Sequence, residues 1–281
     1  MKLGLGSYAY RWSIGLKDKQ PEVPLGPLGF MDKAVRHGVE LVQFADNVPL
    51  QGCTLRELEA IARYAQSHAL EIELGTEGIV NGHAQQYLEL ATTLNAKLVR
   101  ATLNAQDLAQ ARAKLVKSLQ QTVEAYASEG VTLALENYFL FPSVTLIDIL
   151  QQVNHPHLGV CLDVANSIVS HEWPETTIQQ LAPFAVNLHL KDYRFEVDPY
   201  GVGFQAVGVP LGEGEMDIQN VFDALVTAKV NSDLNVILEY WLPRAAIDQE
   251  GLQLEDVWTR QSVAAAQPYV EAFNQAHRVE A

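Results

Sequence analysis

Short apolar runs alternate with longer stretches of helical periodicity from one end of the chain to the other. Most of the apolar runs end on a polar residue, which is typical of parallel strands covered by helices. They predict eight strands, at residues 2–6, 39–45, 71–75, 97–102, 132–136, 159–163, 186–190 and 236–240. The segments between and after them predict helices near residues 29–37, 55–68, 84–94, 105–128, 144–152, 176–181, 218–229 and 254–275.

Eight strand–helix units in series predict an α/β protein with a single (β/α)8 TIM barrel domain over residues 1–281. The length agrees with the ~250 residues that are typical of this fold. No linker rich in Pro, Gly or Ser divides the chain into two domains. Residues 15–27 and the Gly- and Pro-containing residues 193–215 are expected to be irregular loops, and the second is long enough to be a lid.

Four consecutive predicted strands end on an acidic residue or carry a histidine close to their end. Active sites of TIM barrels lie at the carboxyl ends of the strands. Side chains alternate along a strand, so the leucine before each of these residues would pack outward and the polar side chain would face the barrel mouth. The four residues are Glu136, Asp163, His189 and Glu239.

Three converging carboxylates would repel one another strongly without a cation. A set of two glutamates, one aspartate and one histidine suits one octahedral divalent ion, Mn²⁺ or Mg²⁺ first, with Co²⁺ or Zn²⁺ as alternatives. A single strand-end carboxylate is usually solvated or ion-paired, and a single strand histidine usually belongs to the core. The metal-site hypothesis therefore depends on the common register of the four strands. Cys161, two residues before Asp163, is expected to be a packing residue.

Composition narrows the class of protein. Acidic residues outnumber basic ones 34 to 19, for a net charge of −15, which argues against a general nucleic-acid binder. Two cysteines are too few for a disulfide framework and suggest a reducing compartment. We see no signal peptide and no apolar run of about 20 residues that could span a membrane. We therefore expect a cytoplasmic protein whose partner is a small molecule.

Several short motifs resemble those of the xylose isomerase-like TIM barrel superfamily of sugar isomerases and epimerases. They are Leu135-Glu136-Asn137, Leu162-Asp163-Val-Ala-Asn166, Asn187-Leu-His189-Leu-Lys191-Asp192, Gly212-Glu-Gly214 and Leu238-Glu239. Other short segments look similar to those of its sugar phosphate isomerase/epimerase branch. They are Gly6-Ser-Tyr, Asp46-Asn-Val-Pro-Leu50, Gly203-Phe204 and Gly208-Val-Pro-Leu-Gly212.

The resemblance implies one divalent ion held by Glu136, Asp163, His189 and Glu239, with both glutamates also acting as acid and base. The substrate would be a sugar or sugar derivative that reacts through an enediolate, as in aldose–ketose isomerisation or epimerisation. Barrel enzymes of this superfamily are often dimers or tetramers, so the resemblance is also compatible with a homo-oligomer.

The first alternative is a metal-dependent decarboxylase of a 3-oxo sugar acid, as in apiose catabolism. In that branch the third strand tends to end Gly-Thr-Arg-Gly, whereas this chain has Gly75-Thr-Glu77-Gly. The missing arginine places decarboxylation second. An inosose dehydratase-like lyase, a non-catalytic sugar-binding barrel and an apurinic endonuclease are further alternatives. The endonuclease fits worst, because it needs about three zinc ions and additional histidines.

Further residues near the predicted strand ends could contact the substrate. Lys191 shares the inward face with His189, and Asn166 stands where related proteins often have a histidine. Phe204 lies in a glycine-flanked segment that could cover the site. The expected substrate-binding residues are Asn166, Lys191, Arg194, Arg100, Tyr8, Trp12 and Phe204.

Overall fold

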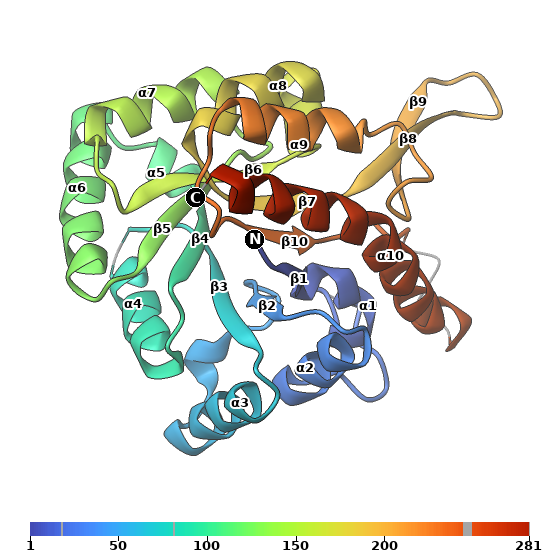
Figure 1. Cartoon of the computed structure of the whole chain (residues 1–281), viewed down its shortest axis with the longest axis horizontal. Helices are drawn as coiled ribbons and strands as arrows, with labels where there is room; N and C mark the ends of the chain where they lie inside the picture. Colours follow the sequence, from blue (N-terminus) through green and yellow to red (C-terminus); the bar gives the residue numbers. More distant parts are fainter. Residues whose placement is uncertain (18, 81, 244–248, 281) are drawn as a thin grey trace.

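The computed structural model describes residues 1–17, 19–80, 82–243 and 249–280. Eight parallel strands close into a barrel in the order β1-β10-β7-β6-β5-β4-β3-β2 (Figure 1). Their bounds are β1 Leu3–Gly6, β2 Leu41–Phe44, β3 Glu71–Glu77, β4 Leu98–Thr102, β5 Thr132–Glu136, β6 Leu158–Asp163, β7 Ala185–Leu190 and β10 Asn235–Leu238. The prediction of a single (β/α)8 TIM barrel is confirmed.

Helices form a ring around the barrel (Figure 1). The longer ones are α2 Pro27–Arg36, α3 Leu55–Ser67, α4 His83–Leu94, α6 Arg112–Ser128, α7 Ser143–Val153, α8 Pro174–Leu181, α9 Ile218–Thr227 and α10 Gln249–Glu280. Local capping sets some of the boundaries, as at α3, where Thr54 and Glu57 form a capping box. None of the described helices combines the length and the apolar character that a bilayer span requires.

The helix predicted over residues 105–128 is two helices, α5 (Ala105–Leu108) and α6. Asn104 caps α5 by accepting hydrogen bonds from the backbone N–H groups of Gln106 and Asp107. The side chain of Asp107 in turn accepts from the Asn104 N–H, which completes a second capping box. This local pairing closes a single turn before α6 begins.

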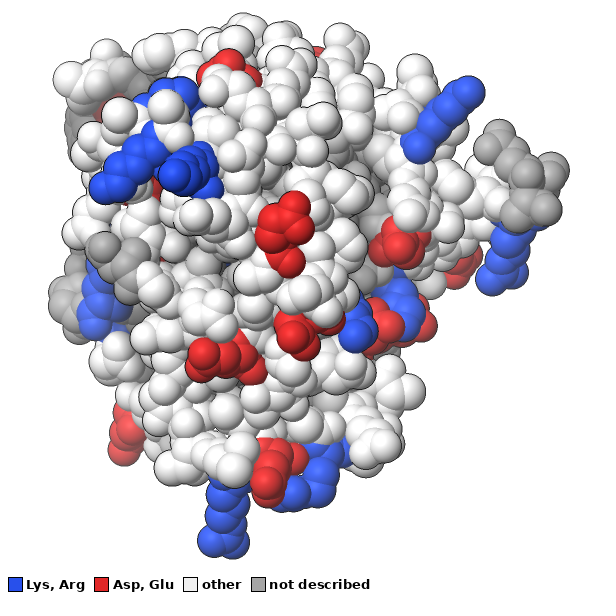
Figure 2. Space-filling view, turned by 90° about the vertical axis from the view of Figure 1, so that its left-hand side faces the viewer, with Lys and Arg blue, Asp and Glu red and all other residues white. Residues whose placement is uncertain are grey.

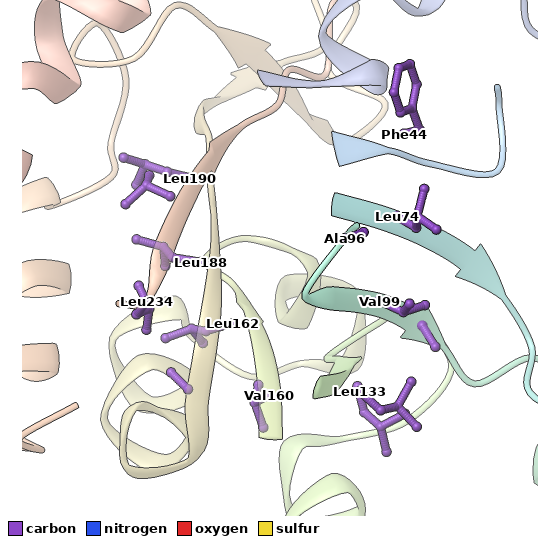
Figure 3. Close-up of a cluster of buried hydrophobic side chains, with 14 of the residues drawn as sticks. Phe44, Leu74, Ala96, Val99, Leu133, Val160, Leu162, Leu188, Leu190 and Leu234 are labelled. Atoms are coloured by element: carbon purple, nitrogen blue, oxygen red, sulfur yellow. The ribbon is translucent and has the colours of Figure 1, made fainter. Parts of the chain in front are cut away.

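The leucines that precede the four predicted ligands pack outward, as the alternation along the strands requires. They belong to the main hydrophobic core between the barrel and the helices, part of which is drawn in Figure 3 with Leu162 and Leu188 labelled. Leu98, Ala134 and Cys161 form a separate small cluster with Val186. Much of the remaining barrel interior is therefore available to polar side chains.

The segment expected to be an irregular loop, residues 193–215, contains an antiparallel hairpin that we did not predict. Strands β8 (Asp192–Val197) and β9 (Phe204–Val209) pair along their whole length and extend outward from the barrel (Figure 1). Gly201 and Gly203 take positive φ values of 74° and 119° in the connecting turn, a conformation that glycine adopts without strain.

Asp192 anchors the base of this hairpin. Its carboxylate accepts hydrogen bonds from the backbone N–H groups of Gly212, Gly214 and Met216. A Cβ atom at Gly214 would lie 2.2 Å from Asp192 Oδ1, so no larger residue fits there. The Gly212-Glu-Gly214 motif therefore has a structural role, which is to wrap the chain around Asp192.

Candidate active site

The four predicted metal ligands converge at the carboxyl ends of β5, β6, β7 and β10. His189 lies at their centre, with its Nδ1 atom 3.7 Å from Glu136 Oε1, 4.0 Å from Asp163 Oδ2 and 3.5 Å from Glu239 Oε2. None of the four residues is more than 5% exposed. Ligand atoms of Asp163, His189 and Glu239 lie within 4.8 Å of one another.

Two of these residues bury an atom that contacts no cationic side chain and has no hydrogen-bond partner among the described residues. The atoms are His189 Nδ1 and Glu239 Oε1, whereas Glu136 Oε2 faces Arg100 and Asp163 Oδ2 faces Lys191. Leaving a buried polar atom without a hydrogen bond costs about 1–3 kcal/mol, and more when the group is charged. A single divalent cation among Asp163, His189 and Glu239 would give both atoms a partner and would add to the neutralisation of the carboxylates by Arg100 and Lys191. The residues present therefore fit such a cation.

The orientation of His189 is set by Gln43 of β2, which is fully buried. The Gln43 side-chain amide donates to Glu73 Oε2 at 3.0 Å, so its oxygen points the other way. That oxygen lies 2.8 Å from His189 Nε2 and accepts the hydrogen of this nitrogen. The arrangement turns Nδ1 toward the carboxylates. Burial opposes the charging of His189, but Glu239 and Glu136 outweigh it and raise its pKa, and a bound cation would displace the Nδ1 proton and take this nitrogen as a ligand.

Glu73 of β3 was not among the predicted site residues. It accepts hydrogen bonds from the amides of Gln43, Asn187 and Asn235, at 2.9–3.0 Å, in the middle of the barrel. The signal in the sequence was Glu73 between the apolar residues Ile72 and Leu74 of a predicted strand, because a buried charged group needs hydrogen-bond partners in a polar interior.

Cys161 also lies near His189 and Glu136 and belongs to a second group of atoms that could hold a metal. Its thiol, however, donates to Asn187 Oδ1 at 3.3 Å. Burial and the nearby Glu136 raise the pKa of the thiol well above its usual value. Cys161 packs in the small cluster with Leu98 and Ala134, so we take the three carboxylates and the imidazole as the candidate donor set.

Glu136 is held by Arg100 and Asn166. Arg100 Nε lies 3.0 Å from Glu136 Oε2, and the Asn166 amide donates to Glu136 Oε1 at 2.9 Å. Burial alone would raise the pKa of Glu136, but the charges of Arg100 and His189 outweigh it and lower the pKa. Arg100 itself packs over Gly75, two residues before the end of β3, where a Cβ atom would lie 3.2 Å from the Arg100 Cζ.

Glu239 is held by Lys191, whose Nζ lies 3.0 Å from Glu239 Oε2 and 2.7 Å from Asp163 Oδ2. Here too burial opposes ionisation, but His189 and Lys191 lower the pKa of Glu239 below its usual range. The side chain approaches β1 closely, because a Cβ atom at Gly6 would lie 2.9 Å from Glu239 Oε1. Both glutamates are therefore ionised at neutral pH.

The other expected substrate-binding residues do not all reach this site. Tyr8 is half-buried and donates to Asp46, which lies 3.9 Å from Arg100. Trp12 is buried in a small separate cluster with Leu242, and its indole N–H donates to Leu242 O. Arg194 and Phe204 are exposed on the hairpin, and Arg194 is paired with Glu196. These two residues lie outside the ligand cluster because β8 leads the chain away from the barrel.

A cavity of about 810 Å³ opens at the opposite end of the barrel, among residues that begin the strands. It is lined by residues that include Glu71, Lys97, Thr132 and Asn235. In TIM barrels this end contributes to stability, whereas the reaction takes place at the carboxyl ends of the strands. The ligand cluster, and not the cavity, is therefore the candidate active site.

Charged side chains are scattered over the face of the molecule shown in Figure 2. Acidic and basic groups are mixed there, and the described residues form no continuous basic surface on this face. This face therefore lacks the clustered positive charge that binding of a polyanion would require.

Known proteins share this architecture. The chain is 30% identical over 265 residues to a 3-oxo-isoapionate decarboxylase of Pectobacterium atrosepticum, and the match covers 94% of each protein. A xylose isomerase-like TIM barrel protein from Mycobacterium smegmatis, solved in complex with magnesium, has a TM-score of 0.69 at 15% identity and covers 97% of both chains. A D-psicose 3-epimerase from Clostridium cellulolyticum H10, solved with D-tagatose, has a TM-score of 0.70 at 14% identity over 98% of this chain and 99% of its own.

The two solved structures show a common fold, and the decarboxylase extends the likeness to the sequence. The sequence model of the xylose isomerase-like TIM barrel family matches residues 31–261, which is most of the chain. The chain belongs to the xylose isomerase-like TIM barrel family.

Proposed function

We propose that the protein is a divalent-metal-dependent enzyme that isomerises or epimerises a sugar, or sugar derivative, carrying a carbonyl next to a hydroxyl-bearing carbon. The observation that carries this proposal is the placement of two buried, ionised glutamates around one histidine nitrogen. Glu136, at the end of β5, lies 3.7 Å from His189 Nδ1. Glu239, directly after β10, lies 3.5 Å from the same nitrogen. Two bases on different strands can reach a substrate from different sides.

When bound, a divalent cation polarises the substrate carbonyl and stabilises the negative charge of an enediolate. The best-matched ions are Mn²⁺ and Mg²⁺, with Co²⁺ and Zn²⁺ as alternatives, because the donors are three carboxylates and one imidazole. One glutamate removes the proton from the carbon next to the carbonyl. The other returns a proton to the neighbouring carbon or to the opposite face. Lys191 and Arg100 orient the substrate oxygens.

A second candidate reaction is decarboxylation of a 3-oxo sugar acid, in which carbon dioxide leaves and one proton is returned to the resulting enediolate. Two observations favour it: the 30% identity to a decarboxylase over nearly the whole chain, and two buried cations beside the glutamates. Glu77 stands at the end of the third strand, where the decarboxylase branch tends to have an arginine. Arg100 of β4 lies over Gly75 of the same strand, where it can bind a carboxylate.

The test is a panel of ketoses, aldoses and 3-oxo sugar acids, assayed in deuterated water with added Mn²⁺. Deuterium incorporation into a ketose without release of carbon dioxide supports isomerisation or epimerisation. Release of carbon dioxide from a 3-oxo acid alone supports decarboxylation. Turnover that continues unchanged in excess chelator contradicts both reactions as proposed.

We further propose that the protein works in a reducing compartment, the cytoplasm. Cys53 and Cys161 are both free thiols, and Cys161 is fully buried beside the candidate ligands. A chain without disulfides is typical of such compartments.

A further inference from the structure

Arg100 lies between two carboxylates at the mouth of the site. Its Nε atom faces Glu136 Oε2 at 3.0 Å, and a terminal nitrogen of the same guanidinium lies 3.9 Å from Asp46 Oδ1. Arg100 and Glu136 are buried, whereas the side chain of Asp46 is 34% exposed. Asp46 is therefore the member of this row that a bound molecule can reach from solvent.

Tyr8 fixes the orientation of Asp46. Its hydroxyl donates to Asp46 Oδ2 at 2.8 Å, and its carbonyl oxygen accepts from Arg11 Nε at 3.2 Å. The Arg11 guanidinium also lies 5.4 Å from the centre of the Tyr8 ring. An ionised carboxylate has about four lone-pair sites, so the hydrogen bond from Tyr8 leaves Asp46 able to accept further hydrogen bonds. The hydroxyl groups of a sugar can donate them.

The surroundings of Asp46 are acidic. Burial raises the pKa of the half-buried Tyr138, which lies just after β5, and the charges of Glu136 and Asp46 raise it further. Glu77, exposed at the end of β3, adds to this effect, and Arg100 opposes it. Three carboxylates and one guanidinium therefore act on this part of the mouth. A phosphate placed here would be repelled by like charges, whereas a neutral hydroxyl would not.

The second buried cation of the mouth, Lys191, has no spare charge either. Its Nζ atom lies 2.7 Å from Asp163 Oδ2 and 3.0 Å from Glu239 Oε2. With a divalent ion bound, the ion and the two buried cations balance four carboxylates, which are those of Glu136, Asp163, Glu239 and Asp46. A phosphate ester adds about −1.5 to −2 charges at pH 7. These groups therefore leave no positive charge for a phosphate.

The loop after β7 has the geometry of an anion site, but this site is already filled. TIM barrels frequently bind phosphate at the loops that follow the seventh and eighth strands. Here the backbone N–H groups of Gly212, Gly214 and Met216 converge on one anion, as backbone groups do in phosphate-binding loops. That anion is the buried carboxylate of Asp192. An internal side chain thus takes the place that a phosphate could occupy.

We propose that Asp46 is a specificity-determining residue of this site. Its carboxylate accepts hydrogen bonds from hydroxyl groups at the end of the substrate remote from the reacting carbons, and its charge excludes a phosphate from that end. The substrate is accordingly an unphosphorylated sugar or sugar derivative. This inference rests on the proposed function, which places the reacting carbons at the ligand cluster and the rest of the substrate toward Arg100 and Asp46.

The kinetic test compares each ketose and 3-oxo sugar acid of the panel with the same compound phosphorylated at its remote terminal carbon. The wild-type protein should have the higher kcat/KM for the unphosphorylated compound. Asp46→Asn keeps the shape of the side chain and one acceptor oxygen but removes the charge. It should narrow this preference roughly tenfold, because a like charge close to the phosphate is lost. The change should lie mainly in KM, since Asp46 does not reach the reacting carbons.

Asp148→Asn is the matched control. Asp148 lies on the outer helix α7, and its Oδ2 atom is 3.7 Å from Arg112 Nε, so the same charge is removed from a similar ion pair. This variant should keep the wild-type preference. Circular dichroism melting curves check that each variant folds.

Binding measured by calorimetry on the Mn²⁺-loaded protein separates this inference from the proposed function. A binding preference for the unphosphorylated compound that Asp46→Asn narrows would support the role of Asp46, even if no compound were turned over and the proposed reaction were wrong. Equal binding of the two compounds by the wild-type protein would overturn the inference, and so would an Asp46→Asn variant with the wild-type preference. A wild-type protein that binds no compound of either kind would overturn it together with the proposed function.

Discussion

The active-site mouth has two halves, one around Glu136 at the end of β5 and one around Glu239 after β10. The two halves hold these glutamates in different ways. Glu136 is fixed by a guanidinium and an amide, since Arg100 and Asn166 each contact a different carboxylate oxygen. Glu239 is held by the ammonium of Lys191, which it shares with Asp163. A guanidinium is a rigid planar donor, whereas an ammonium is a point charge on a flexible stem. Glu136 is therefore the more tightly positioned base, and Lys191 is the cation that a substrate can more easily redirect.

The largest expected effect is loss of either glutamate. Glu136→Gln and Glu239→Gln keep the shape of the side chain but remove its ability to take a proton. Each should lower kcat by about 10²–10⁴-fold, as is typical when a general acid or base is removed. The measurement is deuterium incorporation into a ketose, or carbon dioxide release from a 3-oxo acid.

Glu71→Gln serves as the control, because Glu71 is exposed at the opposite end of the barrel and pairs with Lys2. It should have wild-type activity. If only one of Glu136→Gln and Glu239→Gln lost activity, a single glutamate would carry out the proton transfers. The hypothesis that both glutamates act as acid and base would then be wrong.

The next effect concerns His189, which both halves share. Gln43→Leu removes the oxygen that accepts the hydrogen of His189 Nε2. Affinity for Mn²⁺, measured by calorimetry on the folded variant, should fall by about 10–100-fold, as for other residues that orient a metal ligand. Asn235→Ala removes one of the donors to Glu73 without touching Gln43, so it should leave the affinity nearly unchanged. Equal losses in both variants would mean that general disruption of the interior, and not the histidine orientation, lowers affinity.

A pH profile separates the two cations. A cation stabilises the ionised glutamate, so its removal raises the carboxyl pKa and moves the acidic limb of kcat/KM to higher pH. Among the groups that lower the pKa of Glu136, Arg100 is the strongest, whereas His189 exceeds Lys191 for Glu239. Arg100→Met should therefore shift the limb by about one to three pH units, and Lys191→Met by less. Equal shifts would show that the two halves are electrostatically equivalent.

The same two variants report on the charge of the substrate. If it carries a carboxylate, removing Arg100 or Lys191 should raise KM by roughly 10–100-fold, the value of a hydrogen bond to a charged group. KM for a neutral ketose should change far less. A similar rise for both substrates would argue against direct contact between either cation and the carboxylate.

The sequence predicted the barrel and the convergence of four polar side chains because both follow from strong local rules. The strands are apolar with period-two alternation, and the carboxyl ends of parallel strands in a barrel share one rim. Glu136, Asp163, His189 and Glu239 could therefore be brought together without knowledge of the packing.

Other features of the fold and of the candidate site could not be predicted, because they depend on tertiary contacts that the alternation of apolar and polar residues does not specify. The hairpin escaped prediction because its strands lie outside the barrel and are joined by a glycine-containing turn, as an irregular loop would be. Trp12 lies in a short helix after the first strand and packs in a separate small cluster with Leu242, and the Glu255 carboxylate accepts from its backbone N–H at 2.7 Å. The link from Glu73 through Gln43 to His189 joins three strands, and only the closed barrel places them together.

The smallest expected effect concerns Asn166, whose side-chain amide donates to Glu136. Among the described residues, no amide side chain donates to Glu239 in the same way. Asn166→Ala removes the hydrogen bond to Glu136 Oε1 and leaves Arg100 in place. At about 1 kcal/mol for one hydrogen bond, kcat should fall roughly fivefold and the two halves should become more alike. Ser167→Ala, at the next buried position, is the matched control and should have no such effect. A loss as large as that of Glu136→Gln would mean that Asn166 contacts the substrate directly, so that the halves differ in chemistry as well as in rigidity.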